Sequence, residues 1–154
     1  MALKIGDMAP DFSLLASTGN IISLKGMIGK KVVLYFYPKD DTPGCTKEAC
    51  GFRDTKDDLK DLGVVILGVS KDSLKSHDKF INKYNLNFTL LVDENGTVSD
   101  LYGAWGEKKS YGKVYMGIRR MTFLIGEDGK IEKIWSNVKP EVHAQQVLDS
   151  LKVD

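Results

Sequence analysis

The two cysteines of the chain, Cys45 and Cys50, lie five residues apart in a stretch that could carry thiol chemistry. Thr42 and Pro43 come just before them, and threonine at an N-cap followed by proline is a common start for a helix. Cys45 then takes the third helical position, where free backbone N–H groups and the helix dipole favour an anion. Because the thiolate is the reactive form of cysteine, this position predicts a nucleophilic Cys45.

Cys50 cannot reach Cys45 while such a helix is intact. Five helical residues correspond to roughly 7.5 Å of rise and about 140° of rotation, which separates the two Cα atoms by roughly 8.7 Å. A disulfide tolerates no more than ~7 Å, so a bridge between them requires the first turn to unwind. We expect this unwinding to be part of a redox cycle. The competing interpretation is that Cys50 is a small buried hydrophobic residue on a helix face.

Metal binding is a weaker interpretation of the same pair. The C-x4-C spacing lacks the tight loop of zinc sites, and no third or fourth ligand lies nearby in the sequence. His77 and His143 each stand alone on an expected helix, where a solvated or hydrogen-bonded histidine is more frequent than a ligand. In a reducing compartment a close cysteine pair is typically catalytic, redox-sensing or metal-binding rather than structural.

Composition and charge are those of an ordinary globular protein. The chain has 154 residues and a formal net charge of +1, with lysines and acidic residues interspersed. We expect one domain over residues 1–154 and no nucleic-acid-binding or membrane-binding surface. The longest apolar run, 32–37, is too short to span a bilayer, and the N-terminus lacks the apolar core of a signal peptide. We therefore expect a cytoplasmic protein.

The elements that position the cysteines alternate between strands and helices. A continuously apolar strand at 32–37, expected to be buried on both faces, leads into the cysteine helix at 43–62. Residues 103–117, which are rich in glycine, lysine and aromatic residues, are predicted to form a long irregular loop in which Trp105 and Tyr111 pack. This order indicates an α/β fold with a mixed sheet and helices on both faces. The other predicted elements are a hairpin turning at 17–20, strands at 64–69 and 89–92, helices at 73–84 and 98–102, a hairpin of strands 120–125 and 131–135, and a helix at 140–151.

The cysteine stretch resembles the active-site signature of the peroxiredoxins. The run from Tyr37 to Cys50 is similar to their bacterioferritin comigratory protein (PrxQ) branch, and the similarity continues in 9–12, 102–109 and 117–125. The resemblance implies a thioredoxin-like fold, an α/β domain whose central mixed sheet is flanked by helices and preceded by an N-terminal β-hairpin. It also implies a thiol peroxidase that reduces hydrogen peroxide and organic hydroperoxides without a metal, haem or nucleotide cofactor. The residues of the signature are Thr42, Pro43, Gly44, Cys45 and Thr46, preceded by Phe36, Tyr37 and Pro38.

The resemblance also implies a role for each cysteine. Cys45 is the peroxidatic residue, whose attack on the peroxide leaves a sulfenic acid. Cys50 is the resolving residue, which condenses with that sulfenic acid to an intramolecular disulfide. A dithiol protein of the thioredoxin type, or glutaredoxin or glutathione, then reduces the disulfide by exchange. Because the pair needs no partner subunit, we expect a monomer.

The implied supporting residues surround the first cysteine. Thr42 orients the peroxide and Pro43 shields the thiolate. Arg120 and the backbone N–H groups at Gly44 and Cys45 stabilise the charge that develops on the leaving oxygen.

Interpretations without a role in catalysis stay open for Thr42, Arg120 and Glu48. Thr42 could act only as an N-cap. Arg120 could be an exposed strand residue. Arg119 stands beside it, and strand alternation places the two side chains on opposite faces. Glu48 could be a solvated helix residue or could pair with Arg120 and hold it in place.

Two other functions remain alternatives on the same fold. A general thiol–disulfide oxidoreductase usually carries a C-x-x-C motif, which the C-x4-C spacing does not supply. A non-enzymatic redox sensor would use the same disulfide to switch a surface.

Overall fold

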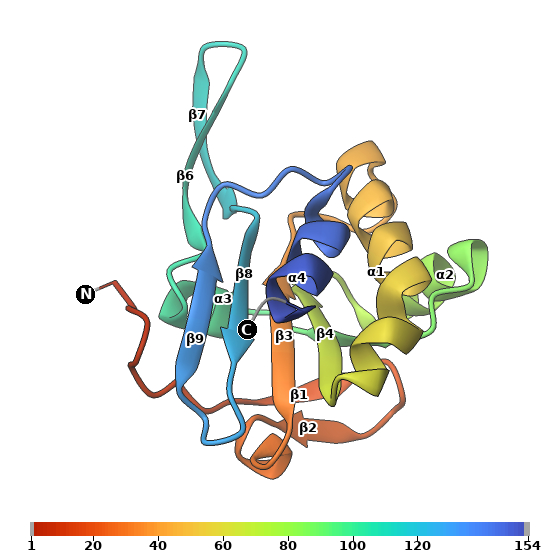
Figure 1. The fold of residues 1–154 in the computed structure, drawn as a ribbon. Helices are drawn as coiled ribbons and strands as arrows, with labels where there is room; N and C mark the ends of the chain where they lie inside the picture. The colour runs from red at the N-terminus through yellow and green to blue at the C-terminus, as the bar shows by residue number, and fades with distance from the viewer. Residues whose placement is uncertain (1, 153–154) are drawn as a thin grey trace.

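The computed structural model of the chain describes residues 2–152 and has a seven-stranded mixed β-sheet at its centre (Figure 1). The strand order is β2-β1-β5-β4-β3-β8-β9, and β3 runs parallel to β4 and antiparallel to β8. The α/β fold class and the N-terminal hairpin are confirmed. In chain order the elements are β1 (Ser13–Ala16), β2 (Ile21–Ser23), the 3-10 helix η1 (Lys25–Met27), β3 (Lys31–Phe36), α1 (Pro43–Asp61), β4 (Val64–Ser70), α2 (Leu74–Tyr84), β5 (Thr89–Val92), α3 (Thr97–Leu101), β6 (Trp105–Ser110), β7 (Lys113–Ile118), β8 (Met121–Ile125), β9 (Ile131–Trp135) and α4 (His143–Lys152).

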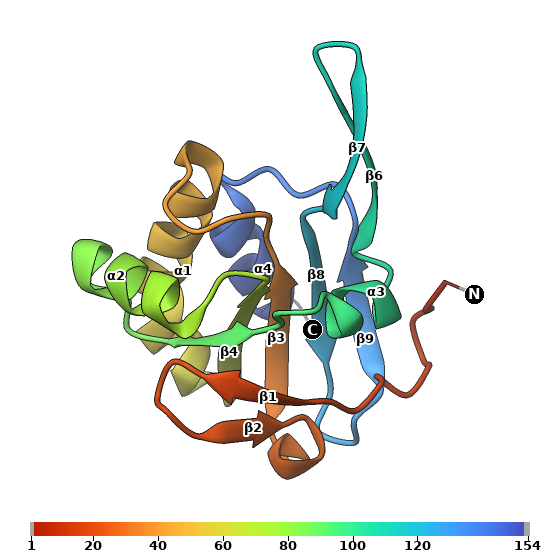
Figure 2. The ribbon, with the colours of Figure 1, turned by 180° about the vertical axis from the view of Figure 1, so that it is seen from behind.

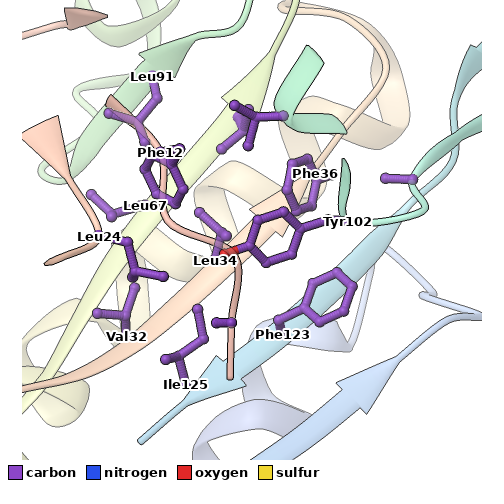
Figure 3. Close-up of a cluster of buried hydrophobic side chains, with 14 of the residues drawn as sticks. Phe12, Leu24, Val32, Leu34, Phe36, Leu67, Leu91, Tyr102, Phe123 and Ile125 are labelled. Carbon is purple, nitrogen blue, oxygen red and sulfur yellow. The ribbon is translucent and has the colours of Figure 1, made fainter. Parts of the chain in front are cut away.

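Helices lie on both faces of the sheet. Helices α1, α2 and α4 cover one face, while α3 and the N-terminal segment cover the other (Figures 1 and 2). Strand β3 is buried on both sides because successive side chains of a strand point to opposite faces. Val32, Leu34 and Phe36 enter the core under α3, which Figure 3 shows in close-up. Val33 and Tyr35 enter the core under α1.

Aromatic packing fixes α1 against β3. The ring of Phe52 on α1 stacks on Tyr35 with centroids 4.7 Å apart, and Tyr35 also stacks on Tyr37 at 5.4 Å. Such pairs contribute about 0.5–1.5 kcal/mol beyond the area that they bury. The helix that carries both cysteines therefore packs on β3 through Phe52, two residues after Cys50, and the contact lies close to the end of the strand.

The prediction of an irregular loop over 103–117 is wrong, because this segment forms the β6–β7 hairpin. Tyr111 and Gly112 at its tip both have positive φ, 51° and 78°, the conformation of a two-residue type I′ turn. The hairpin projects beyond the central sheet (Figures 1 and 2). Val114, Tyr115 and Met116 are exposed along β7, so the segment lacks the alternation of a half-buried strand.

Smaller differences concern side chains. Trp105 is partly buried and packs under Lys71, but Tyr111 is fully exposed and does not pack as expected. Helix α4 starts at His143 rather than at the predicted residue 140, so Val142 precedes the helix and is 46% exposed. Within residues 2–152, no helix is both long and apolar enough to cross a membrane.

Candidate active site

Cys45 lies in the first turn of α1, as predicted. Helix α1 starts at Pro43, and the N–H of Thr46 donates to the Thr42 carbonyl at 2.8 Å. Cys45 is 1% exposed and Cys50 is half-buried. Both are free thiols, and the helix is continuous through Cys50, so the structure describes the dithiol form.

Thr42 occupies the N-cap position but does not cap the helix with its side chain, which corrects that expectation. Its backbone is extended, while its hydroxyl donates to the carbonyl of Lys39 at 2.9 Å. The free N–H groups of the first turn of α1 therefore have no Thr42 oxygen as acceptor and can stabilise an anion instead. The Thr42 oxygen keeps lone pairs that can accept a hydrogen bond, because its own proton is directed toward Lys39.

Arg120 reaches the first turn of α1 from the segment before β8. Its Nη1 donates to Oε1 of Glu48 at 3.2 Å, and the Glu48 side chain is only 1% exposed. Its Nη2 lies so close to Gly44 that a Cβ at that position would meet it at 2.6 Å. Arg119 instead donates to the Gly103 carbonyl at 2.7 Å. Arg120 is thus the arginine that lies at the cysteine helix, and Glu48 is its partner rather than a solvated residue.

The buried Glu48 carboxyl has an unusual proton affinity. Burial raises its pKa to about 7, although the charge and hydrogen bond of Arg120 act in the opposite direction. Its second oxygen, Oε2, has no hydrogen-bond partner among the described residues. A carboxyl group with this pKa can exchange a proton near neutral pH one turn away from Cys45.

Two polar groups of the site were missed by the sequence analysis. The hydroxyl of Tyr35 is buried without a hydrogen-bond partner in the described part of the chain. Burial, followed by the charges of Glu48 and Cys45, raises the pKa of Tyr35 well above its usual value. Lys108 on β6 donates to the Ile118 carbonyl at 3.0 Å, and burial followed by the charge of Arg120 lowers its pKa. Tyr35 was hidden in a continuously apolar run, and Lys108 in the segment taken for a loop.

Both histidines are buried and hydrogen-bonded. The Nε2 of His143 lies 2.7 Å from Oγ1 of Thr122, and His77 bridges Asp40 and the Leu91 carbonyl. In the region from residue 2 to residue 152, no group of three or more His, Cys, Asp or Glu side chains is arranged to hold a metal ion.

A thioredoxin-like sheet with a buried cysteine at the start of the helix that follows its central strand defines a thiol-based redox enzyme. A sequence model described as the AhpC/TSA family matches residues 5–134. A Bcp-type peroxiredoxin sequence of Coxiella burnetii is 53% identical over 98% of this chain and 100% of its own length. Peroxiredoxin Bcp of Bacillus subtilis is 47% identical over 99% and 97%. The solved peroxiredoxin Q of Xanthomonas campestris is 39% identical over 97% and 95%, with a TM-score of 0.89.

The chain belongs to the AhpC/TSA family, and within it to the peroxiredoxins of the Bcp (PrxQ) branch. The resemblance found in the sequence and the thioredoxin-like fold that it implied are both confirmed. The protein is a peroxidase, with a peroxide as substrate and a thiol as reductant.

Proposed function

We propose that Cys45 is the peroxidatic residue of this peroxidase and that Cys50 resolves its oxidised form. The observation that carries the proposal is the position of Cys45 in the first turn of α1, with the Arg120 guanidinium against the adjacent Gly44 backbone. Free N–H groups, the positive end of the helix dipole and a fixed cation meet at this position, which suits an anionic reacting group. The same donors suit the negative charge that develops on a departing oxygen.

The first step forms an S–O bond and breaks the O–O bond. The Cys45 thiolate attacks one peroxide oxygen, which stays on sulfur as the sulfenic acid. The other oxygen leaves as hydroxide or alkoxide, is stabilised by Arg120, and takes up a proton. Thr42 accepts a hydrogen bond from the peroxide, since its own hydroxyl proton is engaged with Lys39. Pro43 starts the helix and shields the thiolate from water.

The second step forms the disulfide. The Cys50 thiol condenses with the Cys45 sulfenic acid and releases one water molecule. Because both residues belong to a continuous helix, the Cα atoms must approach by roughly 2 Å from the ideal helical separation, which requires the N-terminal part of α1 to unwind. Cys50 is half-buried and is not part of the hydrophobic core, so the core need not open for it to approach Cys45.

The substrates extend from hydrogen peroxide to organic hydroperoxides. Alkyl peroxide reduction is described for the bacterioferritin comigratory protein of Xanthomonas campestris, which is 39% identical to this chain. We propose a thioredoxin-type dithiol protein as reductant, with glutaredoxin or glutathione as the alternatives. Exchange of two thiols with the disulfide restores the dithiol form. The intramolecular pair suits a monomer, and a reducing cytoplasm suits a disulfide that must be reopened in every cycle.

Rapid mixing of the reduced protein with hydrogen peroxide tests the proposal. Trp fluorescence should report a fast transient, and intact mass should fall by about 2 Da as the disulfide forms. Cys45→Ser should abolish both signals. Cys50→Ser should react once and then stall, or depend on an added thiol. Insulin reduction without peroxide consumption would instead indicate a thiol–disulfide oxidoreductase, and oxidation without sustained turnover would indicate a sensor.

A further inference from the structure

A buried hydrogen-bond network lies next to the turn 37–42, which leads from β3 into α1. The Asp40 carboxylate is its centre and accepts three hydrogen bonds. Tyr37 donates from its hydroxyl to Oδ1 at 2.6 Å, while the Ser76 hydroxyl and the His77 Nδ1 lie 2.8 Å and 2.7 Å from Oδ2. Three hydrogen-bond partners on one buried carboxyl group fix its orientation. We call Tyr37, Asp40, Ser70, Asp72, Ser76 and His77 the turn network.

Both ring nitrogens of His77 lie within hydrogen-bond distance of an oxygen atom. Its Nε2 lies 2.9 Å from the carbonyl oxygen of Leu91, which can only accept, so Nε2 carries a proton. Its Nδ1 lies 2.7 Å from Oδ2 of Asp40. Burial alone would lower the pKa of His77, but the hydrogen bond and charge of Asp40 prevail and raise it. A buried pair of His77 and Asp40 thus ties the turn to β5.

Helix α2 holds the same turn at a second residue. Asp41 has a φ of 57°, a left-handed conformation that is unusual for a non-glycine residue. Its carboxylate accepts from Lys83 Nζ at 2.8 Å and from the Tyr84 hydroxyl at 2.7 Å. The first turn of α2 therefore holds Asp40, and the last turn holds Asp41.

The loop between β4 and α2 supplies the remaining contact. The backbone N–H of Asp40 donates to Oδ2 of Asp72 at 2.8 Å, and the Ser70 hydroxyl donates to the same oxygen at 2.8 Å. Both the backbone and the side chain of Asp40 are thus fixed. None of these hydrogen bonds involves a residue of α1.

The position of turn 37–42 also fixes Thr42. The carbonyl that accepts the Thr42 hydroxyl belongs to Lys39, which directly precedes Asp40. A shift of Asp40 would therefore move the Thr42 oxygen and the first residue of α1 together. We propose that Asp40 and His77 are positioning residues, which keep turn 37–42 stationary on β5 and α2 while the start of α1 opens and closes. This inference rests on the proposed function of Cys45.

The turn network can stay formed while α1 opens. Unwinding breaks helical hydrogen bonds such as that from Thr46 N–H to the Thr42 carbonyl, but it leaves every bond of the turn network intact. A fixed turn lets Thr42 and Cys45 return to one geometry after each cycle. Displacement of a reacting group by about 1 Å can reduce a rate by about a hundredfold.

Asp40→Asn tests the inference, because it keeps the shape of the side chain and removes its charge. Asp93→Asn is the matched control. Asp93 is also a buried carboxylate with three hydrogen bonds, from the Val98 N–H at 3.2 Å and from the Ser99 N–H and hydroxyl at 2.8 Å each, and none of these three bonds involves the turn network. Its backbone N–H donates to the Ser70 carbonyl at 2.9 Å, and the substitution leaves that backbone bond in place. The measurements are the rate constant for oxidation of Cys45 by hydrogen peroxide, the rate of the following disulfide step, and unfolding by urea.

We expect Asp40→Asn to slow Cys45 oxidation by about tenfold to about a hundredfold, with the disulfide step changed far less. Asp93→Asn should lose stability but keep the wild-type oxidation rate. His77→Gln should slow oxidation in the same way as Asp40→Asn. If His77 had a purely structural role, the substitution would lower the free energy of unfolding and leave the oxidation rate unchanged. Equal oxidation rates in Asp40→Asn and wild type, or equal slowing in Asp93→Asn, would overturn the inference.

Failure of the inference and failure of the proposed function give different results. If Asp40→Asn does not fold, Ser76→Ala removes a single donor to Asp40 from a half-buried site, and an oxidation rate unchanged from wild type then contradicts the inference. A wild-type protein that shows no oxidation dependent on Cys45 overturns the proposed function itself, whatever the variants do.

Discussion

Arg120 donates from Nη1 to Oε1 of Glu48 across 3.2 Å, and this contact joins the segment before β8 to the helix that carries both cysteines. The Arg120 side chain is 21% exposed, whereas Glu48 is buried. Glu48 therefore holds the Arg120 guanidinium on its buried side, and the other side of the guanidinium remains accessible. A fixed guanidinium can stabilise a developing oxyanion without reorganising during the reaction.

Glu48→Gln is predicted to slow the oxidation of Cys45. The glutamine keeps the size of the side chain but removes the negative charge that holds Arg120. We expect the rate constant with hydrogen peroxide to fall by on the order of tenfold, because the guanidinium loses its fixed orientation. Stopped-flow fluorescence measures this rate. Arg119→Gln is the control, since Arg119 contacts the Gly103 carbonyl instead, and an equal loss in that variant would argue against the Glu48–Arg120 pair.

The same substitution should change the pH dependence of stability. The pKa of Glu48 is about 7 in the folded protein, against about 4.5 for an exposed glutamate, so the folded state holds this proton more tightly. The stabilisation linked to it is complete below pH 4.5 and is lost as the pH rises through 7. Relative to Glu48→Gln, the wild-type protein should therefore lose free energy of unfolding over this interval. Urea unfolding of both proteins at several pH values measures the difference, and parallel curves would contradict it.

Gly44→Ala is predicted to impair catalysis without unfolding the protein. The added Cβ would lie 2.6 Å from Nη2 of Arg120, so the guanidinium must move away from the first turn of α1. Alanine is also a better helix former than glycine by about 1 kcal/mol, so the helix itself is not weakened. Peroxide consumption should fall while the melting temperature stays close to that of the wild type. Gly51→Ala on the same helix is the control, because its Cβ meets Ala144 instead of Arg120.

His143 should make the protein sensitive to acid. Burial lowers its pKa to about 4, from 6.5 for an exposed histidine, so the unfolded chain binds this proton more tightly than the folded one. Its contribution to stability is therefore present above pH 6.5 and is lost as the pH falls toward 4. This trend opposes that of Glu48, so it is measured as the difference between the wild type and His143→Gln. A difference that does not change between these pH values would show that His143 titrates normally.

The sequence was sufficient for the parts of the site that depend on local signals. The apolar run of β3 and the Thr-Pro start of α1 predicted where Cys45 lies, because strand burial and helix initiation are properties of neighbouring residues. The capping role of Thr42 was wrong because the Lys39 carbonyl competes for its hydroxyl, and only the folded turn brings that carbonyl close. The contact of Glu48 with Arg120 was left open for the same reason, since 72 residues separate the two.

The elements that were missed are those whose partners lie far apart in the sequence or whose apolar residues face solvent. His77 looked isolated, yet it joins Asp40, 37 residues earlier, to Leu91. The β6–β7 hairpin looked irregular because its apolar residues are exposed and its turn uses Tyr111 in a left-handed conformation. Neither feature leaves a periodic pattern in the sequence.

Amide exchange across residues 42–52 should rise when the protein is oxidised. In the dithiol form α1 is continuous from Pro43, so the amides of its first turns are protected wherever they have helical acceptors. A Cys45–Cys50 disulfide holds the two Cα atoms within ~7 Å, which an intact helix does not allow, so these amides must lose their partners. Exchange at residues 37–41 should stay unchanged, because the turn network contains no residue of α1. Oxidised Cys50→Ser, which cannot form the bridge, is the control and should keep the protection of the reduced protein. Identical protection in both redox forms of the wild type would mean that the disulfide forms without unwinding, or does not form within this helix.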